Sequence, residues 1–147
     1  MNNPKIEKKP TGDVKPGRIL IVDDDPDFRE LLNLILHKEG FETAIAENGE
    51  DFLHKIDDFQ PDLVTLDVMM PGLTTEEILE KLITKKCKPK IILLTVVRYS
   101  DEALDEILKK SNIVAYIDKP FDFDDFIDTV NGLLQTNKFR NNLCLKA

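Results

Sequence analysis

The chain has 147 residues, of which 41% are hydrophobic, and its 28 acidic and 20 basic side chains give a net charge of −8. This length fits a single domain, and the acidic balance argues against nucleic-acid binding by that domain, which would need a clustered basic face. No apolar run approaches the ~20 residues of a membrane span and the first residues lack the apolar stretch of a signal peptide, so we expect a cytoplasmic protein.

Three segments of the chain differ in their patterning. Residues 1–17 combine proline, glycine and lysine without apolar periodicity, which predicts a flexible N-terminal leader. Residues 18–135 alternate between strand and helix patterns five times and are expected to form the folded domain. Residues 136–147 are polar and poorly patterned, which is typical of a C-terminal tail.

The first strand is expected at residues 19–22, where apolar residues follow one another without interruption. Asp25 is the predicted N-cap of the next helix, and Pro26 occupies its first position. Gly40 is expected to end this helix. Helical spacing predicts that its inner face consists of Phe28, Leu31, Leu32 and Ile35.

Residues 41–46 form the second predicted strand, and their alternating pattern is typical of an edge strand. The short helix that follows carries its apolar residues at Phe52, Leu53 and Ile56. The third strand is expected at residues 63–66, and Thr74 with Glu77 has the spacing of a capping box for the next helix. The apolar residues of that helix are Ile78, Leu79, Leu82 and Ile83.

The fourth strand is expected at residues 91–95, and Ser100 is the predicted cap of the helix that follows it. The fifth strand is expected at residues 113–117, and Asp122 opens the last helix. The apolar residues of these two helices keep helical spacing, at Leu104, Ile107 and Leu108 in one and at Phe123, Phe126, Ile127, Val130, Leu133 and Leu134 in the other.

Strict alternation of strands and helices predicts an α/β fold, in which helices cover both faces of a parallel sheet through right-handed crossovers. Ligands of such doubly wound sheets bind outside the carboxyl ends of the strands. The polar residues that follow or end the predicted strands are Asp23, Asp24, Asp67, Thr95 and Lys119. We therefore expect a site for Mg²⁺ and a phosphoryl group at this end, because a divalent cation would relieve the repulsion between the acids.

With these residues in this order, the chain resembles the response-regulator receiver domain of two-component signalling, as found in chemotaxis regulators. The resemblance covers residues 18–135 and is carried by four blocks, residues 19–25, 62–72, 92–95 and 116–121. It implies a flavodoxin-like (βα)5 fold, a doubly wound five-stranded parallel sheet with the strand order 2-1-3-4-5.

The resemblance implies that Asp67 accepts a phosphoryl group from a phosphohistidine on a sensor histidine kinase or phosphotransfer protein. An ionised carboxylate is a weak nucleophile that needs positioning more than it needs a base. Asp24 and Asp67 would bind Mg²⁺ directly, Asp23 would bind it through water, and the main-chain carbonyl of Met69 would complete the protein ligands. Magnesium accepts such a set, because it prefers a few carboxylates with water and phosphate oxygens around it.

The resemblance also implies that Lys119 pairs with one phosphoryl oxygen and that the Thr95 hydroxyl donates a hydrogen bond to another. Thr95 would then move toward the phosphoryl group, and Tyr116 would turn inward behind it. A downstream protein partner would read the face formed by the last two helices and the fifth strand, or this face would form a homodimer. The domain would be a switch and not a metabolic enzyme, since its only chemistry is the Mg²⁺-dependent phosphorylation and dephosphorylation of Asp67.

Several residues near the expected acceptor depart from the family pattern. Val96 replaces the usual small residue after Thr95, and its branched side chain would narrow access to Asp67. Met69 and Val97 stand two positions beyond Asp67 and Thr95, where neither side chain can orient an attacking water. We therefore expect a comparatively long-lived acyl phosphate.

Two other functions stay open. The acids Asp23-Asp24-Asp25 satisfy the Asp-x-Asp motif of haloacid-dehalogenase-type phosphatases, although that interpretation leaves Asp67 unexplained. A receiver-like module that binds partners without phosphorylation is the other alternative, and it stays open because of Val96 and of Thr75, which stands where the family usually has glycine. Among single residues, Asp25 is best explained as a helix cap, and a packed strand aromatic is the alternative to the switch role expected for Tyr116.

Overall fold

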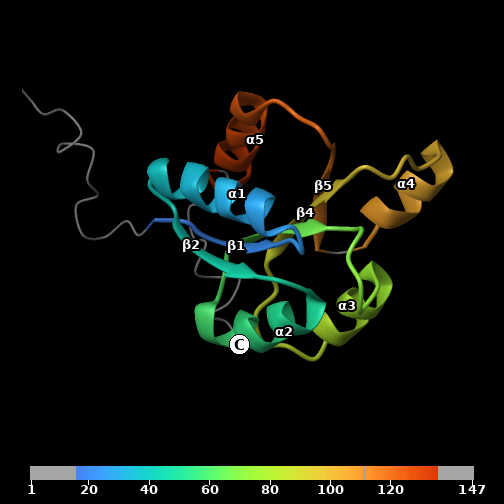
Figure 1. Ribbon diagram of the computed structural model, residues 1–147. Coiled ribbons are helices and arrows are strands. Elements are labelled where there is room, and N and C mark those ends of the chain that lie inside the picture. The colour runs from blue at the N-terminus through green and yellow to red at the C-terminus, as the bar shows by residue number, and fades with distance from the viewer. Residues whose placement is uncertain (1–15, 111, 136–147) are drawn as a thin grey trace, which may run out of the picture.

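The computed structural model describes residues 16–110 and 112–135, in which five strands and five helices alternate (Figure 1). The predicted leader lies outside the described residues except for its last two, and the predicted tail lies wholly outside them. The elements are β1 (Arg18–Val22), α1 (Pro26–Lys38), β2 (Glu42–Ala46), α2 (Gly49–Phe59), β3 (Leu63–Asp67), α3 (Thr75–Leu82), β4 (Lys90–Thr95), α4 (Asp101–Leu108), β5 (Ile113–Asp118) and α5 (Phe123–Gln135).

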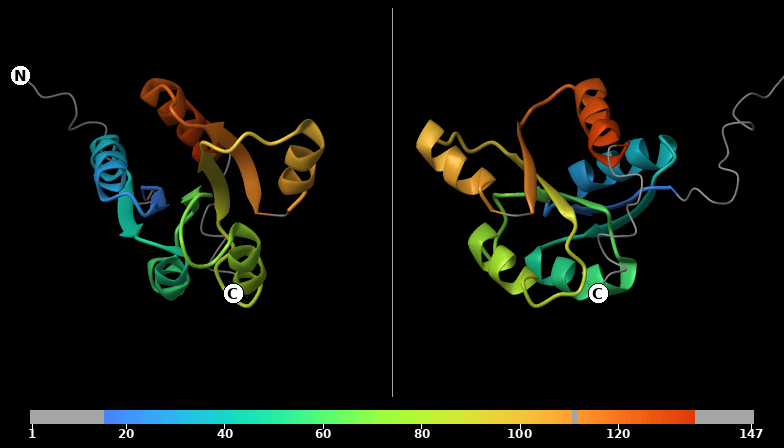
Figure 2. Two further views of the ribbon diagram at one scale, coloured as in Figure 1. Left: turned by 45° about the vertical axis from the view of Figure 1, so that its right-hand side comes forward. Right: turned by 180° about the vertical axis from the view of Figure 1, so that it is seen from behind.

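The five strands form one parallel sheet in the order β2-β1-β3-β4-β5. Helices α1 and α5 cover one face of the sheet, while α2 and α3 cover the other and α4 lies beside the β5 edge (Figures 1 and 2). Residues 41–46 were expected at an edge, and β2 is indeed an edge strand. The doubly wound α/β architecture and its strand order are therefore confirmed.

Two hydrophobic clusters hold the helices on the sheet, one on each face. Successive residues of the central strands alternate between them, because side chains of a strand point to opposite faces. In β1, Ile19 and Ile21 pack under α1 and α5, whereas Leu20 and Val22 pack over α2 and α3. All four side chains are almost fully buried, so beyond Arg18 the strand is wholly apolar up to Asp23, which directly follows its carboxyl end.

Local side-chain signals begin the helices as expected. The Asp25 carboxylate accepts hydrogen bonds from the backbone of the first turn of α1, and Pro26 stands at the first helical position. At α3 the Thr74 hydroxyl accepts from the Glu77 N–H at 3.1 Å, and the Glu77 carboxylate accepts from the Thr74 N–H at 2.9 Å. The predicted capping box is thus confirmed, as is the Ser100 cap of α4.

Three of the apolar residues expected at helical spacing are exposed instead of packed on the sheet, namely Leu31, Ile83 and Leu108, the last at 40% exposure. Leu31 is 40% exposed, and Leu36 is buried in its place next to Leu32. At 3.6 residues per turn Leu31 lies about 100° around the helix from Leu32, which turns it out of the stripe that faces the sheet. Ile83 is 74% exposed, because α3 ends at Leu82 and Ile83 is already its C-cap.

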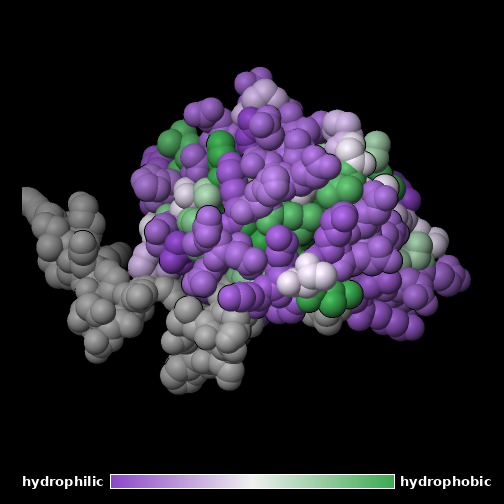
Figure 3. Space-filling model, turned by 90° about the horizontal axis from the view of Figure 1, so that it is seen from below, coloured by the Kyte–Doolittle hydropathy of each residue, from purple (hydrophilic) through white to green (hydrophobic). Residues whose placement is uncertain are grey.

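The face formed by α2 and α3 is mostly hydrophilic, with a smaller apolar area near its centre (Figure 3). The apolar side chains of these two helices mainly point to the sheet, since the buried ones are Phe52, Leu53, Ile56, Ile78 and Leu82. Within residues 16–110 and 112–135, none of the helices has the length and apolarity needed to cross a bilayer.

Thr65 is a polar residue in the middle of the core. It lies in β3, is 1% exposed, and its hydroxyl has no hydrogen-bond partner among the described residues. A buried hydroxyl without a partner costs about 1–3 kcal/mol of desolvation. We therefore expect Thr65→Val to raise the free energy of unfolding by about 1 kcal/mol, measured by urea denaturation.

The matched control is Thr43→Val in edge strand β2, where the side chain is only half-buried and little change is expected. A lower or unchanged urea midpoint for Thr65→Val would contradict the prediction. It would show that the hydroxyl is satisfied by a buried water molecule.

Candidate functional site

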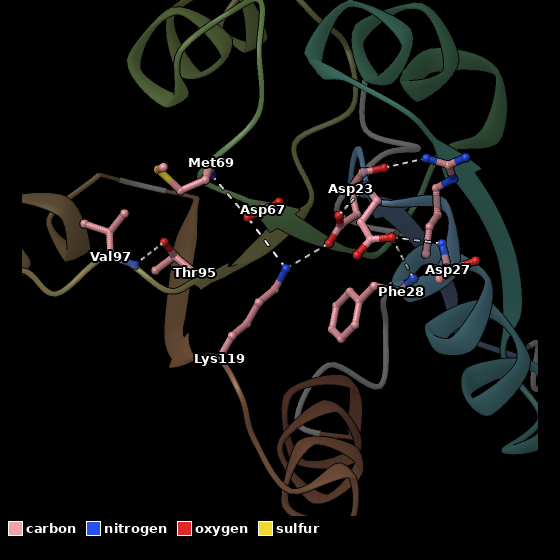
Figure 4. A network of polar contacts seen from close by, with 10 residues as sticks. Asp23, Asp27, Phe28, Asp67, Met69, Thr95, Val97 and Lys119 are labelled. Atoms are coloured by element: carbon pink, nitrogen blue, oxygen red, sulfur yellow. Dashed lines mark hydrogen bonds and ion pairs between the residues drawn. The ribbon is translucent and has the colours of Figure 1, made fainter.

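The carboxyl ends of three strands bring a small set of charged side chains together (Figure 4). Asp23 directly follows β1, Asp67 is the last residue of β3, and Lys119 follows β5. Strands β1 and β3 are neighbours in the sheet, so the two acids lie side by side. Because Lys119 lies two strands away from β3, only its long side chain brings its charge to Asp67.

The acids form one cluster. One carboxylate oxygen from each of Asp23, Asp24 and Asp67 lies within 4.8 Å of the others. Asp23 and Asp67 are buried, whereas Asp24 is exposed, so the cluster opens to solvent on one side. The predicted meeting of these three residues is borne out by this geometry.

Lys119 is the cation placed against these acids. Its Nζ lies 3.1 Å from Asp23 Oδ2 and 3.7 Å from Asp67 Oδ1. Its backbone N–H donates to the Thr95 carbonyl oxygen at 2.8 Å, which fixes the start of the β5–α5 connection on β4. The lysine side chain is 17% exposed, so its charge is partly desolvated and strongly felt by both carboxylates.

The electrostatics of the site act mainly on Asp67. Burial raises the pKa of its carboxyl from 3.8 to about 6, and the negative charge of Asp23 adds to this rise. Lys119 and the Met69 N–H, which donates to Asp67 Oδ1 at 3.2 Å, oppose it. The carboxylate is therefore mainly ionised at neutral pH and becomes protonated when the pH falls below about 6.

Asp23 is held by the loop that follows it. Its Oδ1 accepts from the Asp25 N–H at 2.9 Å, and its carbonyl oxygen accepts from Arg29 Nη1 at 2.6 Å. Asp23 thus orients the acidic loop, which consists of residues 23–25 between β1 and α1. It does not cap α1, because Asp25 does so.

Thr95 is fully buried at the end of β4, and its hydroxyl accepts a hydrogen bond from the Val97 N–H at 2.9 Å. The Tyr116 hydroxyl donates to the Val97 carbonyl oxygen, and its ring packs edge-on against Tyr99 at 5.6 Å. The backbone of Val97 thus connects Thr95 to Tyr116. The described contacts do not include a hydrogen bond between Thr95 and the acid cluster, so its role toward a phosphoryl group stays a prediction.

The donor set fits a magnesium ion. Mg²⁺ prefers oxygen ligands and commonly keeps several waters while taking one or two protein carboxylates. Asp24 and Asp67 supply such oxygens, and Asp23 is close enough to act through water. The ion would also offset the mutual repulsion of the acids, which Lys119 offsets only in part. The Met69 carbonyl as a further ligand stays a prediction.

Two contributors to the site have no strong signal in the sequence. Arg29 reaches back to the Asp23 carbonyl, and the Phe28 ring lies at 4.3 Å from Lys119 Nζ. Phe28 also packs on the α1–α5 side of the core, as its helical spacing predicts. Their positions two and three residues into α1 place them next to the acidic loop, which is the only available local hint.

Comparisons with known proteins agree on one family. The family model described as the response regulator receiver domain matches residues 19–131. The DNA-binding response regulator MtrA of Mycolicibacterium smegmatis is 34% identical over 86% of this chain and 54% of its own length. The regulatory protein AtoC of Escherichia coli is 31% identical over 86% of this chain and 27% of its own length. The chain therefore spans about half the length of MtrA and about a quarter of the length of AtoC.

Solved structures extend this likeness to the fold. The response regulator TrrA from Thermotoga maritima, in complex with Mg(2+)-BeF, is 40% identical with a TM-score of 0.67, over 80% of this chain and 98% of that one. A CheY-like receiver domain protein from Methanospirillum hungatei is 28% identical with a TM-score of 0.73, over 83% and 96% of the two chains.

Proposed function

Because the chain belongs to the family of response regulator receiver domains, the signalling domains of two-component systems, we propose that Asp67 is its phosphoacceptor. The phosphoryl group would come from a phosphohistidine of a sensor histidine kinase or phosphotransfer protein. An oxygen of Asp67 would form a bond to phosphorus as the bond from phosphorus to the histidine nitrogen breaks. The family match leaves no support for the dehalogenase-type phosphatase.

The observation that carries the proposal is the position of Asp67 between one cation and two further acids. Its carboxylate ends the central strand β3, with Lys119 Nζ at 3.7 Å and the acidic cluster around it. This position holds the carboxylate in place, Lys119 favours its ionised form, and the same cation would meet the incoming phosphoryl oxygens. Phosphoryl transfer depends mainly on such positioning and charge stabilisation.

Asp24 and Asp67 would hold Mg²⁺ directly, with Asp23 acting through water and the Met69 carbonyl as a further ligand. When bound, the ion would neutralise charge on the phosphoryl oxygens. The likeness to the Thermotoga protein solved with Mg(2+)-BeF supports this choice of metal. Lys119 would exchange its contact with Asp23 for a phosphoryl oxygen, and the Thr95 hydroxyl would leave the Val97 N–H to bind another.

The switch would run through the residues that surround Val97. Once Thr95 turns to the phosphoryl group, the Val97 N–H loses its acceptor, and the Tyr116 hydroxyl bonded to the Val97 carbonyl must follow the loop. The face of α4, β5 and α5 would thereby change for a downstream protein partner or a second copy. The Mg²⁺-dependent phosphorylation and dephosphorylation of its own Asp67 would be the only chemistry of the domain. It would act in the cytoplasm and would not itself bind nucleic acid.

Intact mass after incubation with Mg²⁺ and acetyl phosphate tests the proposal. We expect one added phosphoryl group in the wild type, and none in Asp67→Asn or after metal removal. Asp58→Asn, at an exposed position of helix α2, is a matched control that should behave as the wild type. An adduct that persists in Asp67→Asn would place the acceptor elsewhere, and unmodified wild type would favour a phosphorylation-independent binding module.

The acyl phosphate is expected to decay slowly. Met69 is 57% exposed beside Asp67, and neither it nor Val97 carries a group that could orient an attacking water. Introducing such a group by Met69→Asn or Val97→Glu should shorten the lifetime by roughly tenfold, as measured by the loss of the phosphorylated mass with time. Rapid decay of the wild type that neither substitution accelerates would contradict this prediction.

A further inference from the structure

An aromatic ring forms part of the environment of Lys119. The Nζ atom lies 4.3 Å from the centroid of the Phe28 ring, as well as 3.1 Å from Asp23 Oδ2 and 3.7 Å from Asp67 Oδ1 (Figure 4). An ammonium group has three N–H donors and no acceptor. Two carboxylates and one aromatic face therefore surround a group with three donors.

Phe28 itself is fixed from two sides. Its backbone N–H donates to the Asp25 carboxylate at 3.4 Å in the first turn of α1. Its ring meets the ring of Phe121 edge-on, with centroids 6.0 Å apart and planes at 80°. Phe121 follows Lys119 by two residues and packs in turn against Phe126 of α5. The Phe28 ring thus bridges the acidic loop and the β5–α5 connection that carries the lysine.

The contact is of a kind that attracts the cation. A lysine ammonium over an aromatic face gains more when it is desolvated than when it is exposed, and the Lys119 side chain is only 17% exposed. An aliphatic side chain at position 28 would offer no negative face, but it would also change the packing. The electrostatic contribution of the Phe28 ring can be separated from its packing by weakening the negative charge of the ring face without changing the shape of the ring.

We propose that Phe28 is a positioning residue for phosphoryl transfer to Asp67, whose ring face holds the Lys119 ammonium above the acid cluster where a phosphoryl oxygen arrives. The inference rests on the proposed function of Asp67. When Lys119 moves from Asp23 to the phosphoryl group, the ring keeps the lysine side chain on the same side of the site. Phe28 does not touch the reacting atoms and acts through Lys119 alone.

A fluorination series tests this role in the full chain. Fluorine atoms on the ring weaken its negative face with little change in shape, so mono-, di- and trifluorophenylalanine are placed at position 28. We expect the rate of phosphorylation by acetyl phosphate with Mg²⁺ to fall with each fluorine, and Phe28→Leu to be ~3- to 10-fold slower than wild type. Phe28→Tyr, which keeps the ring, should retain the rate.

The matched control is the same series at Phe52, which is fully buried on the opposite face of the sheet, and no trend is expected there. A flat rate across the Phe28 series would overturn the proposal, even if Phe28→Leu were slow, because only packing would then matter. A wild type that takes up no phosphoryl group would instead overturn the proposed function of Asp67, and this role with it.

A second readout needs neither metal nor phosphoryl donor. A methylene group beside a ring face has a ring-current-shifted NMR signal, so the ε-methylene of Lys119 should be shifted upfield in the metal-free protein. We expect Phe28→Leu to abolish this shift and Phe28→Tyr to keep it. An unshifted Lys119 signal in the wild type would overturn the contact, whatever the phosphorylation rates.

Discussion

Replacing Asp67 by asparagine is expected to stabilise the metal-free protein at pH 8 by about 2 kcal/mol, although it abolishes phosphoryl uptake. Burial and the charge of Asp23 raise the pKa of the Asp67 carboxyl from 3.8 to about 6. The folded state therefore binds the proton more tightly than the unfolded state does. Asparagine keeps the shape of the side chain without the charge that the folded state disfavours.

The sign of the pH dependence follows from this direction. A raised carboxyl pKa contributes stability below pH 3.8, and that contribution is lost as the pH rises through about 6. The full shift corresponds to about 3 kcal/mol, and losing the ion pair with Lys119 offsets part of it in the variant. The advantage of Asp67→Asn over wild type should thus be largest above pH 7 and should vanish near pH 4.

Thermal unfolding in EDTA at pH 4 and pH 8 measures this difference. At pH 8 the variant should unfold roughly 6 °C above the wild type, because a domain of this size gains a few degrees per kcal/mol. Asp58→Asn on α2 is the matched control and should show no such pH-dependent gain. A variant that is less stable than wild type at pH 8 would mean that the Lys119 contact outweighs the burial of the charge.

Replacing Lys119 by methionine is expected to slow phosphorylation by roughly 100-fold and to tighten Mg²⁺ binding by roughly tenfold. The lysine charge lies within 4 Å of both buried acids, where it repels a second cation. Removing it lowers the cost of bringing Mg²⁺ to the cluster. It also removes the group that would stabilise the charge of the transferring phosphoryl oxygens.

Titration calorimetry with Mg²⁺ and the rate of the mass increase with acetyl phosphate measure the two effects. Lys55→Met is a matched control, because Lys55 pairs with Asp51 at 3.1 Å on α2, away from the site. Lys119→Arg keeps the charge and should leave Mg²⁺ affinity close to that of wild type. Weaker Mg²⁺ binding by Lys119→Met would show that the lysine orders the acids more than it repels the ion.

The strands, the helix starts and the position of the polar residues at strand ends could be predicted from the sequence, because each depends on neighbours only a few residues away. Asp25 caps α1 through N–H groups two and three residues on, and the Thr74–Glu77 box spans three residues. Apolar runs predicted buried strands, and the resemblance of four short blocks to receiver domains predicted the sheet order that the structure shows.

Only the tertiary structure decided which side chains meet. Lys119 and Asp23 are separated by 96 residues, so their contact depends on the sheet order and on where α1 and α5 pack. The same packing puts the Phe28 ring beside Lys119 and turns Leu31 to solvent, since the rotation of a helix on a sheet is not determined by its own apolar residues alone. Sequence patterns thus identified the charged residues of the site, whereas long-range packing set the distances between them.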